Sequence, residues 1–281
     1  MAPNNINFKL LSLNARGIRS FERRKALFGW LMKDKSDICF VKQRTVCIIN
    51  VWGYTEILPK CFSRMVQNSV RVSSFKVDQN GRFIIIEANV QDHPFLFVNL
   101  YAPNKTNEHS IVFEEIIEEL DNFSLAEDCN IVISGDFNVI SDPDLDGNAG
   151  NPKRKESVKC IDNLCLANDL IDIWRIRNPN VKRFTWRQKT PVIQRRLDFW
   201  LVNNGMQEDI DNVDIIPSLK SDHSAIVLSI NGIESRPRGP SFWKLNSSLL
   251  DDKEYVSLIN MKYPLWNDEF KEVNDPRFSG I

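Results

Sequence analysis

The stretch that most constrains the fold is Ile131–Val139, which reads Ile-Val-Ile-Ser-Gly-Asp-Phe-Asn-Val. Its first residues form a short, apolar, β-branched run, which is typical of a strand buried on both faces. Side chains two residues apart in extended backbone project to the same side, so Asp136 and Asn138 would aim at one point beyond the strand's end. Active sites of α/β sheets tend to lie there. An Asp/Asn-rich turn without a further role fits this segment equally well.

The composition indicates one large domain, or one domain with an extension, in an intracellular protein. The 281 residues carry 36 Lys and Arg against 37 Asp and Glu, so any DNA contact has to come from local basic patches. The six cysteines form no C-x-x-C pair and no His lies at zinc-ligand spacing from them, which predicts reduced thiols. The chain shows no signal peptide and no run long enough to span a bilayer, so we expect a soluble protein.

Strands and helices alternate along the chain. Strands are predicted at 7–13, 37–41, 70–77, 82–90, 95–101, 130–134, 184–186, 196–202 and 225–230, and helices at 21–33, 107–123 and 156–168. Asn80-Gly81 marks a β-hairpin, so the sheet cannot be wholly parallel, and a two-sheet α/β sandwich fits best. We expect this domain to cover 1–232 and a linker and tail to cover 233–281.

Short polar motifs follow four of the predicted strands, and a fifth lies in a loop. They are Leu13-Asn14-Ala-Arg-Gly17, Asn99-Leu-Tyr101-Ala-Pro-Asn104, Ser134-Gly-Asp136-Phe-Asn138, Arg195-Arg-Leu-Asp198-Phe-Trp200 and Ser221-Asp222-His223. In this order they resemble the motifs of the endonuclease/exonuclease/phosphatase (DNase I-like) superfamily. More narrowly, the chain is similar to the apurinic-type endonuclease domain of LINE-type (non-LTR) retrotransposons, which is related to exonuclease III. The segment 238–246 is also similar to the stretch that leads toward the reverse transcriptase in such elements.

The resemblance implies a four-layer α/β/β/α sandwich whose active site lies where the strand-end loops of both sheets converge. Asp136 would orient or deprotonate the attacking water. Asn138 and Asn14 would hydrogen-bond that water or a phosphate oxygen, and Tyr101 would lie on the scissile phosphate.

The same resemblance implies a charged pair and a metal site. His223, oriented by Asp198, would donate to the phosphate, and Asp222 would lie near a Mg²⁺ or Mn²⁺ ion. Phosphodiester hydrolysis places negative charge on oxygens, so it needs hydrogen-bond donors and a hard cation in position before reaction. The sequence supports the pairing independently, because Asp198 lies in an apolar strand where an unpaired charge would be costly.

Basic and aromatic residues alternate on both sides of residue 190. The family resemblance implies that this segment binds DNA phosphates and contacts the duplex. The residues that would do so are Arg183, Trp186, Arg187, Arg195 and Arg196. A solvated basic surface is the alternative.

An acidic run at Asp142-Pro-Asp144-Leu-Asp146-Gly147 imitates the start of an EF-hand loop. Its twelfth position is Lys153 instead of Glu, and no helix leads into it, so we predict a turn-rich loop.

The chain departs from the family after the second strand. There the family has a Leu-Gln-Glu-Thr-like motif whose Glu is the principal metal ligand, whereas this chain reads Val41-Lys42-Gln43-Arg44-Thr45. Gln43 takes the Glu position in the most natural register, and Arg44 takes it after a shift of one residue. The stretch 55–70 also lacks the family's Gly-Val-Ala-rich strand, so one inner strand would be missing or rerouted.

Three functions follow from this reading. The first is a Mg-dependent endonuclease that nicks DNA, and the second is a catalytically degraded remnant of it, because Gln43 replaces the metal-ligand Glu. The third is a phosphatase or phospholipase of the same superfamily. In each case we expect a monomer without a small-molecule cofactor, and a retrotransposon product would be found in nucleus and cytoplasm.

Overall fold

The computed structural model describes residues 7–15, 20–43, 46–51, 54–57, 70–91, 93–123, 129–148, 155–218 and 221–231, with 253, 256–258, 260–262 and 264 near the carboxyl end. The chain divides into two compact units, Met1–Arg236 and Pro237–Ile281. The described residues of the second unit are helical. Segment 238–246, which resembles the linker of retrotransposon proteins, lies outside the described residues. No helix in the described parts of the chain is long and apolar enough to cross a membrane.

The first unit contains two six-stranded mixed sheets. The first sheet has the order β13-β14-β1-β2-β3-β4. Its strands are β1 (Asn7–Asn14), β2 (Ile38–Gln43), β3 (Val46–Val51), β4 (Tyr54–Ile57), β13 (Ile210–Ile216) and β14 (Ala225–Asn231). The second sheet has the order β5-β6-β7-β8-β12-β9. Its strands are β5 (Val70–Val77), β6 (Phe83–Val90), β7 (His93–Tyr101), β8 (Asn130–Asp136), β9 (Leu170–Asp172) and β12 (Asp198–Asn203).

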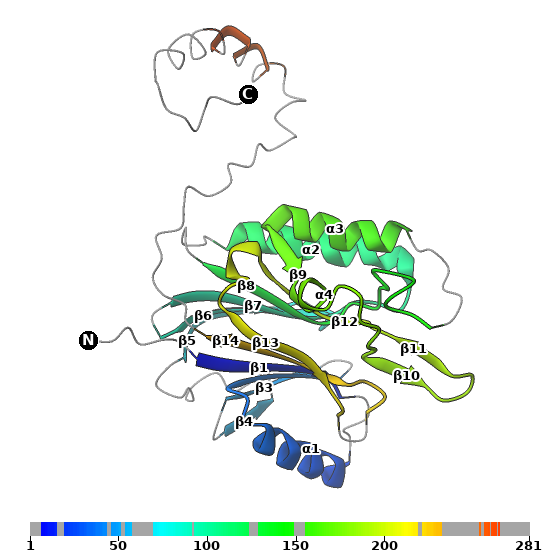
Figure 1. Cartoon of the computed structure of the whole chain (residues 1–281). Coiled ribbons are helices and arrows are strands. Elements are labelled where there is room, and N and C mark those ends of the chain that lie inside the picture. The colour runs from blue at the N-terminus through cyan, green and yellow to red at the C-terminus, as the bar shows by residue number, and fades with distance from the viewer. Residues whose placement is uncertain are drawn as a thin grey trace. The chain divides into compact units, whose positions relative to one another are not determined.

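Helices cover the outer face of each sheet (Figure 1). Helix α1 (Phe21–Asp34) packs on the first sheet through Leu27 and Leu31. Helices α2 (His109–Asn122) and α3 (Lys155–Asn168) pack on the second. The short elements are α4 (Ile173–Arg177), η1 (Thr106–Glu108), η2 (Asn204–Met206) and a hairpin of β10 (Trp186–Gln188) and β11 (Ile193–Arg195). The hairpin projects beyond the two sheets (Figure 1). The predicted four-layer α/β/β/α sandwich is therefore confirmed.

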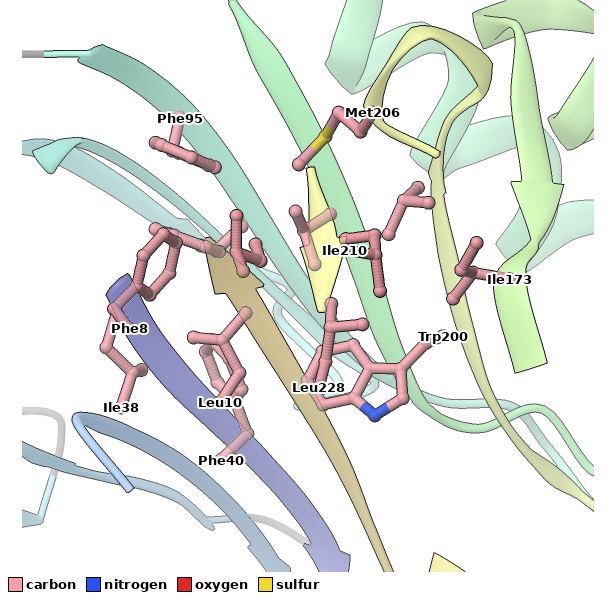
Figure 2. Close-up of a cluster of buried hydrophobic side chains, with 14 of the residues drawn as sticks. Phe8, Leu10, Ile38, Phe40, Phe95, Ile173, Trp200, Met206, Ile210 and Leu228 are labelled. Carbon is pink, nitrogen blue, oxygen red and sulfur yellow. The ribbon is translucent and has the colours of Figure 1, made fainter. Parts of the chain in front are cut away.

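The space between the two sheets is filled by large apolar side chains. Phe8, Leu10 and Phe40 from the first sheet face Phe95 and Trp200 from the second (Figure 2). The ring centroids of Phe8 and Phe95 lie 5.3 Å apart in an edge-to-face arrangement, which is a favourable geometry for aromatic pairs. This core fixes how the two sheets sit on each other, and so it also fixes how the side chains at their strand ends meet.

The strand registers bring the predicted motifs to one end of the sandwich. Strand β1 ends at Asn14 and runs parallel to β2. Strand β7 runs parallel to β8, and Tyr101 is the direct partner of Asp136. Asp198 opens β12 directly opposite Asp136 on the other side of β8. Four motifs that are scattered along the sequence therefore meet at one place.

Most predicted elements are present with shifted ends, but some were missed. Ser20 caps α1, since its side-chain oxygen accepts from the Arg23 N–H. Strands β3, β4, β9, β11 and β13 and helix α4 were not predicted. Of the stretch 55–70, residues 55–57 belong to β4 and Val70 opens β5. Residues 58–69, where the family strand is missing from the sequence, lie outside the described residues, and so does Arg44.

Candidate active site

A carboxylate at the end of β8 lies at the centre of the site. Asp136 is 3% exposed, and the side-chain amide of Asn14 donates to its Oδ2 over 2.9 Å. The backbone N–H of Asn138 donates to its Oδ1 over 3.0 Å. The two sheets thus reach the same carboxyl group, because Asn14 comes from β1 of the first sheet and Asp136 from β8 of the second.

A buried histidine–aspartate pair lies next to Asp136. His223 Nδ1 lies 2.9 Å from Asp198 Oδ2, and its Nε2 lies 3.6 Å from Asp136 Oδ2. The expected partner of the buried Asp198 charge is therefore present. Asn14 Nδ2 also lies 3.5 Å from His223 Nε2, a contact that is a hydrogen bond only when this nitrogen is unprotonated.

Burial and mutual charge shift the pKa values of both central groups. Burial raises the pKa of Asp136 to about 7, and the nearby negative charge of Asp198 adds to the rise, against the lowering effects of His223 and the donors from Asn138 and Asn14. Burial alone would lower the pKa of His223, but attraction to Asp198, Asp136 and Asp222 raises it to about 9. Near neutral pH the site therefore holds an imidazolium beside a carboxyl group that changes its charge.

We expect the metal-free protein to lose stability as the pH rises from about 4 to about 9. Both groups have folded-state pKa values above their ordinary values of 3.8 and 6.5, so the folded chain binds more protons than the unfolded chain in this range. The Asp136 contribution is lost between 3.8 and about 7, and the His223 contribution between 6.5 and about 9. Each group contributes a slope of at most about 1.4 kcal/mol per pH unit. Urea unfolding in EDTA at several pH values measures this.

The Asp136→Asn variant is the control for this pH profile. Subtracting its profile from that of the wild type removes the titration of all other carboxylates. The difference should fall between pH 4 and 7, and an unchanged difference over that range would contradict the raised pKa of Asp136.

Asn138 departs from the geometry expected from the sequence. Its φ is 50°, so the backbone beyond Asp136 is not extended, and the expectation that both side chains project from one extended strand is wrong. The Asn138 side-chain amide donates to the Ala102 carbonyl over 2.6 Å. Together with the bond from its N–H to Asp136, this makes Asn138 a residue that positions the carboxylate. Its contact with a phosphate or a water stays a prediction.

Tyr101 and Gln43 lie at the ends of two strands from different sheets, β7 and β2. Tyr101 is half-buried at the end of β7, beside Asp136 in the register, and the Lys42 ammonium lies 5.7 Å from its ring centroid. The backbone of Gln43 pairs with Val46 at the end of β2. This puts Gln43 next to Lys42, the direct partner of Asn14. Metal binding by Gln43 stays a prediction.

The loop that carries Asp222 and His223 is tied to strand β10. Trp186 pairs with His223 in an isolated β-bridge, and its indole N–H donates to Asp222 Oδ2 over 3.2 Å. The Arg187 N–H donates to the Asp222 carbonyl over 3.0 Å. Trp186 therefore positions the loop that supplies the histidine, whatever its relation to DNA.

A cleft of about 760 Å³ lies beside this loop, and both basic side chains and residues of the site line it. Its lining includes Arg187 and Lys189 from the hairpin and Asp222 and His223 from the loop. Arg187 Nη1 donates to Ser224 Oγ over 3.0 Å, while Arg195 Cζ lies 5.9 Å from the Trp186 ring centroid.

The other two predicted DNA-binding arginines are engaged by the protein itself. Arg183 donates to the Ile215 carbonyl and lies 3.6 Å from Asp214, with its side chain 46% exposed. The prediction of DNA binding is wrong for Arg196, which is 1% exposed. Its guanidinium binds Asp146 through Nε at 2.7 Å and Asp172 through Nη2 at 2.6 Å, so it cannot reach a phosphate.

Three buried polar residues below the site were not recognised from the sequence. The Asn99 side-chain amide donates to Ser12 Oγ over 3.0 Å and to Ser134 Oγ over 2.9 Å. This links the first sheet to the second. Each of the three precedes a site residue by two positions, namely Asn14, Tyr101 and Asp136. Since residues two apart share a face of a strand, a polar residue at this spacing in an apolar run is the signal that could have found them.

Known proteins are similar to the chain in sequence and in structure. Residues 95–227, just under half of the chain, match the family described as endonuclease-reverse transcriptase. An uncharacterized 149 kDa protein of transposon TX1 from Xenopus laevis is 26% identical over 200 residues, which are 69% of this chain and 15% of that protein. An exodeoxyribonuclease of Streptococcus pneumoniae is 30% identical over 177 residues, which are 55% of this chain and 61% of that protein. The chain thus spans less than two thirds of either relative.

Solved structures agree with this match at the level of the fold. The apurinic (AP) endonuclease of Leishmania major superposes with a TM-score of 0.61 over 83% of this chain and 88% of that one, at 14% identity. A humanized TDP2 of D. rerio superposes with a TM-score of 0.56 over 80% of this chain and 99% of that one, at 15% identity. The chain carries a DNase I-like endonuclease/exonuclease/phosphatase domain. Nucleases are among the similar proteins, namely the exodeoxyribonuclease and the AP endonuclease.

The central residues of this endonuclease/exonuclease/phosphatase domain fit a divalent cation. One potential ligand atom each from Asp136, Asp198 and His223 lie within 4.8 Å of one another, and of these His223 can ligate a cation only after its imidazolium loses a proton. Two of these groups are buried carboxylates, and their repulsion contributes to the raised pKa of Asp136. A hard cation prefers carboxylate oxygens and would relieve that repulsion. Asp222, predicted near the metal, is not part of this group of described residues, although its charge acts on His223.

Proposed function

We propose that this chain is a divalent-metal-dependent endonuclease that nicks DNA, of the apurinic or target-nicking type found in retrotransposons. The observation that carries the proposal is the hydrogen-bonded cluster of Asn14, Asp136, Asp198 and His223 at the meeting point of the two sheets. The similarity to a transposon protein and an exodeoxyribonuclease supports DNA as the substrate. The similarity to an AP endonuclease supports the kind of strand break.

In this proposal the residues of the cluster divide the work. Asp136 accepts the proton of the attacking water, a role supported by its position 3.6 Å from His223 Nε2 at the centre of the cluster. His223 is held as an imidazolium by Asp198 and donates to the phosphate as negative charge develops. Asn14 donates its amide N–H into the same space, and Tyr101 contacts the phosphate from the neighbouring strand.

A divalent ion would be held beside Asp136, with Asp222 and the carboxamide of Gln43 as its oxygen ligands. When bound, such an ion neutralises charge on the phosphate oxygens and lowers the pKa of a coordinated water. Mg²⁺ and Mn²⁺ both suit oxygen ligands, and we propose either of them as the cofactor.

DNA would lie along the cleft beside the β10–β11 hairpin. Arg187 lines this cleft together with His223, which places a cation next to the proposed phosphate position. Arg195, Trp186 and the exposed part of Arg183 extend the contact. Backbone contacts of this kind neutralise phosphates and make affinity depend on salt.

Nicking of a supercoiled plasmid tests the proposal. The wild-type chain should relax the plasmid with Mg²⁺ or Mn²⁺ and not in EDTA, and Asp136→Ala should abolish this. Asp144→Ala is the matched control, since Asp144 is an exposed carboxylate in the turn-rich loop and does not belong to the cluster. Nicking that survives Asp136→Ala would overturn the assignment of Asp136.

The second candidate is a catalytically degraded domain with the same fold, and it is favoured by Gln43, a neutral amide where the family motif has a carboxylate. In that case the wild type does not nick, while Gln43→Glu restores metal-dependent nicking and fixes the register of this motif. Turnover of a phosphoinositide or of sphingomyelin without DNA cleavage would instead favour the phosphatase or phospholipase function.

A further inference from the structure

A buried lysine lies at the edge of the site and has no part in the function proposed above. Lys42 is 5% exposed and is the last residue but one of β2. It is the direct partner of Asn14 across the parallel β1–β2 pair, and direct partners project to the same face of a sheet. Because the Asn14 amide reaches Asp136, the Lys42 side chain leaves its strand on the face of the sheet that carries the site.

The Lys42 ammonium is held between the two sheets by backbone oxygens and by an aromatic ring. Its Nζ donates to the Gly81 carbonyl over 2.5 Å and to the Arg82 carbonyl over 2.9 Å. It also lies 5.7 Å from the centroid of the Tyr101 ring. The Arg82 carbonyl accepts a second bond, over 2.7 Å, from the Tyr101 N–H. Lys42 and Tyr101 are therefore held next to each other by the same backbone carbonyl. The Lys42 ammonium is also attracted by the Tyr101 ring, because a cation near an aromatic ring interacts favourably with it.

The charge of this part of the site differs from that of the family motif. In the register that places Gln43 at the Glu position of Leu-Gln-Glu-Thr, Lys42 replaces a neutral Gln and Gln43 replaces an anionic Glu. Both changes act in the same direction, and together they make the end of β2 more positive by two charges. A fixed positive charge in a poorly solvated place acts strongly on phosphate and on metal ions alike.

We propose that Lys42 is a fixed positive charge of the phosphate site, which attracts the DNA phosphate at Tyr101 and weakens the binding of a divalent cation at Asp136. The proposal rests on the proposed function, because it takes Tyr101 and Asp136 to be the phosphate and metal positions. Lys42 acts here as a positioning residue, since its ammonium is buried and held by two carbonyls. In this chain, Lys42 therefore supplies part of the positive charge at the phosphate that a bound metal ion would otherwise supply.

The test compares Lys42→Gln, which restores the family residue, with the wild type and with Lys76→Gln. Lys76 is a matched control because it lies on β5, just before the turn that Lys42 contacts, and is half-exposed in an ion pair with Glu119. Mn²⁺ affinity is measured by calorimetric titration without DNA. We expect Lys42→Gln to bind Mn²⁺ about tenfold more tightly and Lys42→Gln/Gln43→Glu more tightly still. Lys76→Gln should match the wild type.

Binding of a labelled DNA duplex in EDTA provides the second measurement. Lys42→Gln should bind about threefold to tenfold more weakly than the wild type, and Lys42→Arg, which keeps the charge, should restore most of the binding. If Lys42→Gln changes neither Mn²⁺ affinity nor metal-free DNA binding, Lys42 only ties β2 to the turn before β6 and the proposal is overturned. Lys42→Met keeps the length of the side chain and replaces Lys42→Gln if that variant does not fold.

These measurements can reject the proposed role of Lys42 and the proposed endonuclease function independently of each other. If no variant nicks plasmid DNA, including Lys42→Gln/Gln43→Glu, the endonuclease proposal fails, while the Mn²⁺ titrations still decide whether the Lys42 charge acts on the site. If the double variant nicks and Gln43→Glu alone does not, both proposals are supported.

Discussion

Replacing Gly135 by alanine is expected to prevent the domain from folding. Gly135 has a φ of 129°, a backbone conformation that residues with a side chain rarely adopt. A Cβ built on Gly135 would lie 2.0 Å from the carbonyl oxygen of Leu100. Leu100 is its direct partner in the β7–β8 pair, so the obstacle is hydrogen-bonded backbone and cannot rotate away. The two central strands of the second sheet would have to separate. We expect a loss of about 5 kcal/mol or more, comparable to the whole stability of many domains.

Circular dichroism and urea unfolding of purified protein measure this loss. Gly205→Ala is the matched control, because Gly205 lies in η2 and an added Cβ meets nothing within 4 Å. That variant should stay within about 1 kcal/mol of the wild type. A Gly135→Ala protein that unfolds at the same urea concentration as Gly205→Ala would contradict the close packing of β7 and β8 at this point.

Gly135 also shows why the centre of the fold was predictable. The run that precedes it is apolar and β-branched, which indicates a doubly buried strand, and the polar residues directly after it indicate a strand end. The same reasoning at Asn14 and Tyr101 found two more strand ends. The parallel pairs β1–β2 and β7–β8 then bring these ends together, as expected for an α/β architecture. For Asp198, the family resemblance implied the partner His223, and the cost of an unpaired buried charge supported that pairing.

Other features depend on contacts that local sequence does not encode. Arg196 follows another arginine, so the sequence indicates a basic patch. Nothing near Arg196 in the chain indicates that its guanidinium binds Asp146, fifty residues earlier. Strand β13 was missed because its residues Ile-Asp-Asn-Val-Asp-Ile-Ile break the alternation at a β-bulge between Ile210 and Asn212. The positive φ of Asn138 was missed because an extended backbone was assumed beyond the strand end.

The second large effect is expected at Asp146, in the acidic run that imitates an EF-hand. Asp146 is fully buried, and its two oxygens bind Arg196 Nε at 2.7 Å and Arg196 Nη2 at 3.0 Å. Arg175 from α4 donates to the same carboxylate. This carboxylate therefore connects the turn-rich loop with α4 and with the residue two positions before Asp198. Its role is structural, and the turns predicted for this loop are present.

Asp146→Ala should lower the free energy of unfolding by about 3–5 kcal/mol, because it leaves the charge of Arg196 buried with Asp172 as its remaining carboxylate partner. Arg196→Met should cost less, since Asp146 keeps its bond to Arg175. The double variant Asp146→Ala/Arg196→Met should recover part of the loss, because it also removes the buried guanidinium that has lost one of its two carboxylate partners.

Urea unfolding at one pH, with Asp144→Ala as the control, decides this case. Asp144 lies two residues away in the same loop and is exposed, so its removal should change stability by less than about 0.5 kcal/mol. A loss at Asp146→Ala no larger than at Asp144→Ala would mean that Arg196 finds other partners when Asp146 is absent. A large loss at Asp146→Ala that the double variant does not reduce would place the stabilisation in the loop itself. Recovery in the double variant would show that the cost comes from the buried charge of Arg196 after the loss of Asp146. Arg196 lies two residues before Asp198, the aspartate that orients His223.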